Sequence, residues 1–531
     1  MPAHSIPYQK TGYFSKLICD YLDEKPELRP FYHRFPKLEH FRPQFEEKRS
    51  QLSQSQRRAL AKRIMYQYGY NKLSQTTLSN IDLLYEPDTF TVTTGHQLNL
   101  FTGPLYFLYK IFSAINLTER LNREYPKHYF VPVYWMATED HDFDEINYFN
   151  LFGNKLEWQR DAAGAVGRLS TKGLAEVKKA LQKKLGPGKN AETLVSYFAE
   201  AYQNNDNLAD ATRHLANTLF WEYGLVVVDG DDPELKKCFL PYAEKELTDN
   251  LSYKKVSETT KKLTALGYPE QVHPREINLF YLKDNLRERI IEKDGKFFIN
   301  ETDLVFTKEE IIHELHEHPE RFSPNALLRP LYQEVILPNL CYIGGGGELA
   351  YWFQLKDYFN EVEVPFPILL LRNSVLLVPD ALSEKLKKLK TDVEELFLPQ
   401  HELVTRHTYK ISEIDIDFSR QKEFLKQQFK DLYTLAEQTD VTFLGAVGAQ
   451  EKKQLNGLDK LEKRLLKAQK RKHAEELDRL KNLQNQLFPN QSLQERQLNF
   501  AEFYLAHGQG LLDLLKENLE PLEGKFTILE V

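Results

Sequence analysis

The chain has few cysteines for its length. Three occur among 531 residues, and Cys19, Cys238 and Cys341 are far apart in the sequence. Their odd number and wide spacing argue against a disulfide framework and against a CxxC-type zinc site. We therefore expect a reduced protein of the cytoplasm that uses no zinc.

The chain also lacks an excess of positive charge and a long apolar run. Its formal net charge is −7, which gives no whole-chain case for a nucleic-acid partner. The longest apolar stretch, 368–378, is interrupted by Arg372, Asn373 and Ser374 and is too short to span a bilayer. Residues 1–17 contain no apolar h-region of a signal peptide. We expect no membrane partner and a cytoplasmic location.

What the chain does have is polar residues directly after strand-like runs. The apolar run 130–137 leads into TEDHDFDE (138–145), the run 90–94 into Gly95-His96-Gln97, and the run 225–228 into Asp229-Gly230-Asp231-Asp232. Continuous apolar runs are typical of buried parallel strands, and ligands of open α/β sheets bind beyond the carboxyl ends of such strands. The pattern predicts one nucleotide-type site.

The order of elements predicts an α/β fold. A strand at 89–94, a helix at 104–122 and a strand at 130–138 form a βαβ unit, which implies a parallel sheet with a right-handed crossover. Further strands are predicted at 224–229, 340–343 and 368–372, and inserted strands and a helix at 277–282, 296–300 and 308–318. The predicted division is a core in three parts (1–145, 218–245 and 330–385), two insertions (146–217 and 246–329), a helical coiled-coil domain (386–520) and a C-terminal tail (521–531).

Long polar helices are predicted in the last third, at 420–438 and 455–487 around the small linker 444–450 (LGAVGAQ). Leu458, Leu461, Leu465 and Ala468 have coiled-coil spacing, and leucines at 477, 480, 483 and 487 roughly resume it. Helices of this length need a partner surface, so a homodimer is expected. Segment 451–486 has 11 Lys and Arg against 6 Asp and Glu, which indicates a solvated face. A nucleic-acid-binding arm is the alternative, although no aromatic residues interleave the charges.

Segment 91–104 (TVTTGHQLNLFTGP) places glycine, histidine and glutamine after a strand. Glycine lets the backbone approach a ligand closely, and helix N-terminal amides favour phosphate. We predict that Gly95, His96 and Gln97 contact a nucleotide or substrate anion. The spacing matches neither GxGxxG nor a Walker loop, so a tight turn with a hydrogen-bonded histidine is the alternative.

Segment 138–145 combines a histidine with several carboxylates. Such groups hold an amine, bind a divalent cation or act as a general base. In an extended chain Asp140, Asp142 and Asp144 share one side, and Glu139 and His141 share the other, so one set should serve a ligand and the other the scaffold. We assign catalytic roles to Asp140, His141 and Asp142 and a binding role to Glu139. Helix capping and surface charge are the alternative.

The run Gly344–Gly347 opens a helix that carries Tyr351. Four glycines are entropically costly, which favours a ligand phosphate at this helix start over a flexible loop. Arg372 and Asn373 follow the last core strand, where arginine suits a carboxylate or phosphate. No metal site is predicted, because the histidines of segment 313–318 offer no third ligand.

The motifs TGHQLNLFTGPLYFLYK (94–110), PVYWMATEDHDFDEIN (132–147) and GGGGELAYWFQLK (344–356), with the terminal coiled coil, resemble the cysteine-adding enzyme family of bacillithiol biosynthesis along essentially the whole chain. The family often reads TGQQ in the first motif, which favours Gln97 over His96 as the shared ligand contact. The resemblance places Asn99 and Gly103 of this motif among the binding residues.

The resemblance implies a Rossmann-like core similar to class I aminoacyl-tRNA synthetases, two connecting-peptide insertions and a coiled coil that makes a homodimer. The implied reaction adds cysteine to glucosaminyl-malate as an amide, the last step of bacillithiol biosynthesis. It implies ATP, with activation of the cysteine carboxylate as an adenylate, and leaves Mg²⁺ possible as a cofactor.

Two other functions stay open at this point. A metal-dependent hydrolase or nucleotidyl transferase would use Glu139, Asp140, His141 and Asp142, and would carry a stoichiometric divalent metal. A non-enzymatic scaffold of the pathway would use the coiled coil to bind a partner.

Overall fold

The computed structural model describes residues 3–69 and 72–531. Within them the chain forms two compact units. The core unit comprises Ala3–Val375 and Glu495–Thr527, and the hairpin unit comprises Leu376–Gln494 and Ile528–Val531. The chain passes between units within β14 (Val375–Val378), α23 (Gln494–Gln497) and β15 (Lys525–Glu530). Segment 495–527 therefore belongs to the core unit although it follows the helices of the hairpin unit in sequence.

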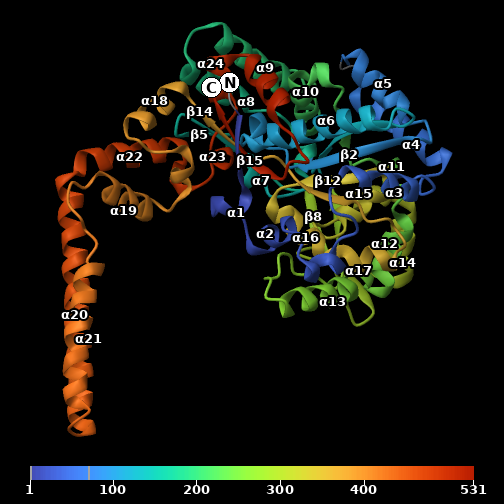
Figure 1. Ribbon diagram of the computed structural model, residues 1–531. Coiled ribbons are helices and arrows are strands. Elements are labelled where there is room, and N and C mark those ends of the chain that lie inside the picture. Colours follow the sequence, from blue (N-terminus) through green and yellow to red (C-terminus); the bar gives the residue numbers. More distant parts are fainter. Residues whose placement is uncertain (1–2, 70–71) are drawn as a thin grey trace. The chain divides into compact units, whose positions relative to one another are not determined.

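The core unit is built on a five-stranded sheet of order β13-β12-β2-β3-β6, in which every neighbouring pair is parallel (Figure 1). The strands are β2 (Thr89–His96), β3 (Tyr129–Met136), β6 (Val226–Asp229), β12 (Asn339–Gly344) and β13 (Ile368–Leu371). The predicted α/β class and parallel core strands are confirmed. All of β3 except its first residue is buried, as its continuous apolar sequence predicts.

The strand order reverses beside β2. The chain places β3 and then β6 on one side of β2, and later adds β12 and β13 on the other side. His96 pairs with Met136 across β2 and β3, and Thr94 pairs with Ile343 across β2 and β12. The carboxyl ends of these three strands therefore meet at one edge, where open α/β sheets bind ligands.

Helices α6 (Tyr106–Glu124) and α3 (Leu38–Lys48) pack onto this sheet. Leu117 and Leu121 of α6 and Phe45 of α3 share one apolar cluster with Phe90 and Val92 of β2. Apolar residues at helical spacing in and just before α6 are buried: Leu105, Leu108, Phe112, Ile115 and Leu121. The 3.6-residue period of the sequence thus gives both the helix and its buried face.

Further elements of the core unit precede, connect and follow the strands. Helix α4 begins with a capping box, in which Ser53 accepts from Gln56 N–H and Gln56 accepts from Ser53 N–H. The elements are β1 (Ala3–Pro7), α1 (Tyr8–Thr11), α2 (Lys16–Leu22), η1 (Pro26–Phe31), α4 (Gln54–Tyr68), α5 (Gln75–Leu83), η2 (Leu100–Thr102), α7 (Phe143–Ile146), η4 (Trp221–Tyr223), α11 (Pro233–Lys237), α12 (Leu240–Asp249), α15 (Arg329–Ile336), α16 (Gly346–Trp352), η6 (Phe353–Leu355), α17 (Lys356–Glu361), α24 (Ala501–His507) and α25 (Gly510–Asn518).

The two segments predicted as insertions, 146–217 and 246–329, belong to the core unit and contain the following elements. The first contains the hairpin β4 (Tyr148–Leu151) and β5 (Asn154–Glu157), then η3 (Val166–Arg168), α8 (Leu174–Leu185), α9 (Lys189–Gln203) and α10 (Leu208–Leu219). The second contains α13 (Leu251–Ala265), α14 (Lys308–Glu317), η5 (Pro319–Arg321) and an antiparallel sheet of order β10-β9-β8-β7-β11. Its strands are β7 (Leu279–Lys283), β8 (Leu286–Lys293), β9 (Lys296–Ile299), β10 (Val305–Thr307) and β11 (Phe322–Pro324). The expected inserted strands and helix are confirmed as β7, β9 and α14.

The hairpin unit is helical, and two long neighbouring helices, α20 and α21, form its hairpin (Figure 1). Its elements are α18 (Asp380–Lys388), η7 (Val393–Phe397), α19 (Gln400–Ile411), α20 (Ser419–Ala436), α21 (Val441–Lys472), α22 (Ala474–Leu487) and η8 (Pro489–Gln491). The predicted linker 444–450 is wrong, because it lies inside α21 and the chain reverses at 437–440. Val447 packs with Phe429 and Ala436, and Asp440 caps α21 by accepting from Phe443 N–H, which offsets the low helix propensity of Gly445 and Gly448.

The single predicted helix 455–487 is also wrong, since the chain breaks at His473 between α21 and α22. Leu461 is 52% exposed, whereas Leu477, Leu480, Leu483 and Leu487 of α22 are buried in the hairpin unit. The second leucine set therefore packs α22 against its own unit rather than extending the seam of α21.

In the described part of the chain, no helix is both long and apolar enough to cross a bilayer.

Candidate active site

A cavity of about 290 Å³ lies at the edge where β2, β3 and β12 end. We call it the strand-end cavity. The predicted residues Gly95, His96, Gln97, Asp140 and Tyr351 all line it. The structure thus brings together residues from the three motifs that the sequence singled out.

The cavity wall also contains charged and aromatic residues that were not predicted. They come from α6, α15, α16 and the ends of β3 and β12: Tyr106, Lys110, Trp135, Arg329, Gln333, Tyr342 and Glu348. The sequence does contain a feature that points to Lys110, because it is the single charged residue in the run 104–117. No such feature points to Arg329 and Gln333, since helix α15 is distant in sequence from the strand ends.

Buried Lys110 and partly exposed Glu348 form an ion pair in this wall. Lys110 Nζ lies 2.8 Å from each Glu348 carboxylate oxygen and also donates to Gly95 O. The Tyr342 hydroxyl donates to Glu348 Oε2 at 2.7 Å, and Gly345 N–H donates to Oε1 at 3.2 Å. Burial lowers the pKa of Lys110, whereas for Glu348 the effect of burial is outweighed by Lys110 and its pKa is lowered. The pair links α6, β2, β12 and α16 at one point of the wall.

His96 is a buried, neutral base in the same wall. Burial, reinforced by the charge of Lys110, holds its pKa well below the usual range. The ring contacts Tyr106 edge-on at 5.4 Å and Phe107 at 5.0 Å, and Nε2 has no hydrogen-bond partner among the described residues. His96 can therefore exchange a hydrogen bond with a ligand but does not carry a positive charge at neutral pH.

Asp140 is an ionised carboxylate between two guanidinium groups. Arg329 Nη1 lies 3.8 Å from Oδ2, and Arg287 Nη1 lies 4.0 Å from Oδ1. Burial raises the pKa of Asp140, but His141 and the two arginines outweigh burial and hold the pKa far below its usual range. A carboxylate with so low a pKa is a poor general base and a good hydrogen-bond acceptor for an ammonium group.

His141 and Asp142 do not line the strand-end cavity. Arg287 Nη1 contacts His141 Nδ1 at 2.6 Å, and Asp142 is exposed. Asp140, His141 and Asp142 are the one group in residues 3–69 and 72–531 whose ligand atoms, within 4.8 Å of one another, could hold a metal ion. The group fits a cation poorly, because a guanidinium occupies one His141 nitrogen and a second guanidinium lies beside Asp140.

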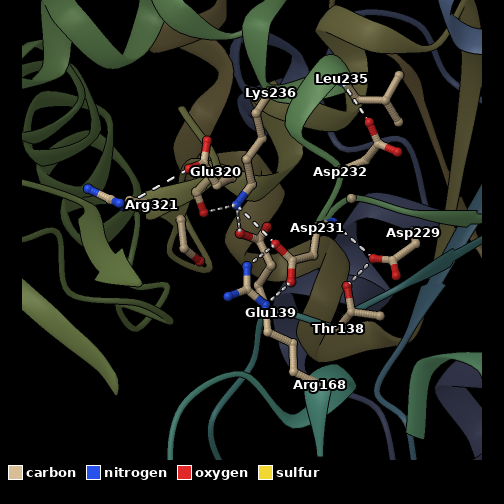
Figure 2. Close-up of polar contacts among 12 residues, drawn as sticks. Thr138, Glu139, Arg168, Asp229, Asp231, Asp232, Leu235, Lys236, Glu320 and Arg321 are labelled. Atoms are coloured by element: carbon tan, nitrogen blue, oxygen red, sulfur yellow. Dashed lines mark hydrogen bonds and ion pairs between the residues drawn. The ribbon is translucent and has the colours of Figure 1, made fainter. Parts of the chain in front are cut away.

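Glu139 points away from the cavity into a buried polar cluster (Figure 2). Lys236 of α11 lies 2.6 Å from Glu139 and 3.3 Å from Asp231, and it donates to Glu320 O of η5 at 3.1 Å. Arg168 of η3 binds both oxygens of Asp231, at 2.6 and 2.9 Å. The cluster joins both insertions to the sheet. Glu139, to which the sequence assigned a binding role, therefore lies in the scaffold, whereas Asp140 lines the cavity.

The acidic run after β6 is not part of the cavity wall. Thr138 donates to Asp229, Asp231 belongs to the Lys236 cluster, and Asp232 caps α11 by accepting from Glu234 and Leu235 N–H (Figure 2). The expectation that all three strand ends supply one site is therefore wrong for β6. Its carboxylates are already occupied by neighbouring donors.

Arg372, Asn373 and the glycine run lie outside the cavity wall. Arg372 is buried and pairs with Glu495 at 2.7 Å, and Asn373 Oδ1 accepts from Ser113 at 2.9 Å.

None of Gly344–Gly347 has a positive φ. Gly344 is required for space, because a Cβ there would lie 2.9 Å from the Tyr342 ring. The start of α16 is capped by Glu348, whose negative charge also complements the helix dipole.

A second hollow of about 260 Å³, here the side hollow, adjoins the strand-end cavity. The two share Gln97 and Tyr106. The predicted residues Asn99 and Gly103 line the side hollow rather than the main cavity. The first motif therefore contributes to two adjacent spaces.

The family comparison covers nearly the whole chain. Residues 1–373 match the family described as "Bacillithiol biosynthesis BshC, N-terminal Rossmann-like domain", and residues 375–531 match "Bacillithiol biosynthesis BshC, C-terminal coiled-coil domain". The chain is 58% identical to a protein of Christiangramia forsetii and 56% identical to one of Flavobacterium johnsoniae, both named "Putative cysteine ligase BshC". These alignments cover 100% of this chain and 99% and 100% of the relatives.

A more distant relative of the same name, from Bacillus cereus, is 27% identical over 97% of this chain and 98% of its own length. A solved structure titled as a putative arginyl-tRNA synthetase from Campylobacter jejuni covers 90% of this chain and 100% of its own with 12% identity. Its TM-score of 0.22 is too low to compare the two folds.

Proposed function

The chain belongs to the BshC family of bacillithiol biosynthesis, and from this membership we propose that it is a ligase that adds cysteine to glucosaminyl-malate. The product would be the amide between the cysteine carboxyl group and the glucosamine amine, formed in the last step of the pathway. The observation that carries the proposal is the strand-end cavity, where ionised and hydrogen-bonding groups from three sequence motifs line one space.

The groups in the wall suit an amine substrate that carries carboxylates. Asp140 accepts from the substrate ammonium, and Arg329 offers a guanidinium fork to a malate carboxylate. His96 Nε2 supplies a further hydrogen bond beside the reacting amine. Arg329 takes the role that the sequence suggested for Arg372, because Arg372 is already paired with Glu495.

ATP is proposed as the second co-substrate, because a carboxylate and an amine do not condense in water without activation. Transfer of the adenylyl group to the cysteine carboxylate would release pyrophosphate. The ammonium would first lose a proton to solvent. Attack by the resulting neutral amine would then form the C–N bond, release AMP and give up a second proton to solvent. The ionised Asp140 contributes by orienting the amine rather than by removing its proton.

We propose further that the enzyme is a homodimer joined through the hairpin unit. Phe424, Leu432 and Leu435 of α20 are 59%, 40% and 56% exposed, and their spacing places them on one side of the helix. Large apolar residues gathered on one exposed face are typical of an interface.

The test of the reaction is mass spectrometry of mixtures containing the protein, cysteine, glucosaminyl-malate, ATP and Mg²⁺. We expect a product heavier than glucosaminyl-malate by one cysteinyl residue, and no product when ATP is omitted. Equal product formation without ATP would contradict the proposed activation. A metal-dependent hydrolase would instead lose its activity on removal of a tightly bound metal, and the arginines around His141 and Asp140 speak against this alternative.

A further inference from the structure

We propose that the side hollow is the subsite for the amino-acid substrate, a small zwitterion that carries a thiol. The assignment deepens the proposed ligase function and rests on it. A reaction that joins two molecules needs two spaces that meet. The side hollow meets the strand-end cavity at Gln97 and Tyr106.

The size of the side hollow fits a small ligand. Its volume of about 260 Å³ is below the range of roughly 300–1,000 Å³ that holds drug-sized molecules. An amino acid placed there would have its ammonium end at Glu145, which contacts Gln97, and its carboxyl end toward Arg496 and Tyr106, where it meets an amine in the strand-end cavity. The two volumes together then accommodate both halves of the product.

The charges of the side hollow match a zwitterion. Glu145 and Arg496 are its two charged residues, and they have opposite signs. The Glu145 carboxylate accepts from Gln97 Nε2 at 3.0 Å and has further lone pairs for an ammonium group. Within residues 3–69 and 72–531, Arg496 has no ion-pair partner, so its guanidinium is available to a carboxylate. A polyphosphate would need more positive charge than this single arginine supplies.

Asn99 adds a neutral acceptor beside Glu145. Its Nδ2 donates to Glu145 O at 3.2 Å, whereas its buried Oδ1 has no hydrogen-bond partner among the described residues. Buried acceptors are normally paired, and an ammonium group supplies three donors. Asn99 and Glu145 thus complement the same end of an amino acid.

The loop that carries Asn99 is held in a costly conformation. Phe101, Thr102 and Gly103 have φ of +49°, +68° and +62°, a region that residues other than glycine rarely adopt. Asn499 Nδ2 donates to Phe101 O and Gly103 O, at 2.8 and 2.6 Å, and Tyr202 accepts from Phe101 N–H at 2.8 Å. Such strain persists only where surrounding contacts enforce it, and it is frequent at ligand sites.

The aromatic residues of the side hollow suggest how a thiol is selected without zinc. Tyr148 and Phe149 line it, and sulfur makes favourable contacts with aromatic rings. Such contacts are modest, so we expect serine to bind roughly tenfold more weakly than cysteine rather than to be excluded.

The test compares Glu145→Gln and Arg496→Gln with the control Asp144→Asn. Asp144 is an exposed carboxylate of the same short helix, α7, and lines neither space. Cysteine binding to the full chain is measured by equilibrium dialysis, with and without a non-hydrolysable ATP analogue, and KM is measured for each substrate. We expect both variants to weaken cysteine binding and raise its KM by about tenfold or more, with the KM for glucosaminyl-malate changed less than about twofold.

The outcomes separate this assignment from the proposed reaction. Product formation in which both variants keep the wild-type KM for cysteine would overturn the subsite and leave the ligase function standing. A raised KM for glucosaminyl-malate instead would assign the hollow to the other substrate. Cysteine binding that depends on Glu145 and Arg496 in a protein that makes no product would support the subsite and contradict the reaction. A wild-type chain that binds no cysteine under either condition would overturn the subsite.

Discussion

Single residues in this protein separate into ligand-facing and scaffold groups even where they are neighbours in sequence. Asp140 lines the strand-end cavity, whereas Glu139 is buried against Lys236 and takes part in joining the insertions to the sheet. The two side chains diverge because Thr138 and Glu139 lie in a turn, in which Asp140 N–H donates to Ala137 O at 3.2 Å. Substitution of a carboxylate that faces the cavity is expected to change substrate binding. Substitution of one that faces the buried cluster is expected to change the stability of the fold.

Substitution of Asp140 by Asn should therefore impair catalysis more than folding. The variant loses the charge that holds the substrate ammonium, and a hydrogen bond to a charged group is worth about 1.5–3 kcal/mol. We expect kcat/KM for glucosaminyl-malate to fall by roughly 10- to 150-fold. Steady-state kinetics with Asp144→Asn as control measures this, and an unchanged kcat/KM would remove Asp140 from the site.

Asp229 provides a pH-dependent prediction. Burial raises its pKa to about 6, and nearby Asp231 adds to the shift while Arg213 opposes it. A carboxyl group with a raised pKa binds its proton more tightly in the folded protein than in the unfolded chain, so it lowers stability as pH rises from about 4 to about 6. The free energy of unfolding of Asp229→Asn minus that of wild type should increase over this window, by up to roughly 3 kcal/mol.

Denaturant unfolding of both proteins between pH 4 and pH 7 tests this. The informative quantity is how the difference between the two free energies changes with pH. A constant offset is expected in addition, because the variant lacks the ion pair of Asp229 with Arg213. A difference that stays flat would show that Asp229 titrates normally.

At the scale of elements, the sequence was sufficient where local pattern and tertiary structure agree. Apolar runs predicted β3 and β12, a run rich in β-branched residues predicted β2, and the helical period of 104–122 predicted α6. The turn of the long hairpin was not predictable in this way, because glycines at 445 and 448 indicate a break while the packing of Val447 with Phe429 depends on a distant segment. The cavity residues Arg329 and Gln333 were missed for the same reason, since their contribution depends on where α15 packs.

The glycines inside α21 lead to a prediction about the hairpin. A Cβ at Gly445 or Gly457 would meet nothing within 4 Å, so alanine fits and removes the entropic cost of glycine in a helix. We expect each substitution to stabilise the hairpin by about 0.5–1 kcal/mol, which slows amide hydrogen exchange in α20 and α21 by roughly two- to fivefold.

Gly448→Ala is the matched comparison, because its Cβ would lie 3.2 Å from the Tyr433 hydroxyl. The close contact of this Cβ with the Tyr433 hydroxyl should cancel part of the gain in hairpin stability. Faster amide exchange in Gly445→Ala would indicate that residues 444–450 are not stably helical. Faster amide exchange in Gly457→Ala would indicate the same for the part of α21 around residue 457.

At the scale of the whole molecule, the proposed dimer predicts the effect of charge on α20. Leu435→Glu places a carboxylate on the exposed apolar face, whereas Lys430→Gln makes the same change of charge at an exposed position on another side of the helix. Light scattering should give twice the chain mass of 62.3 kDa for wild type and Lys430→Gln, and a mass shifted toward the single chain for Leu435→Glu. A wild-type chain that is monomeric at micromolar concentration would exclude this dimer.

The return of segment 495–527 to the core unit sets the order in which the protein can be completed during translation. Glu495 neutralises Arg372, and Asn499 holds the loop of Phe101 and Gly103 in its left-handed conformation. A ribosome that has released residues 1–373 has therefore made every strand of the sheet but not the residues that hold this loop. Nascent and prematurely terminated chains should accordingly form the sheet without a finished side hollow, so the competence to bind substrate arises only once the hairpin unit has been synthesised.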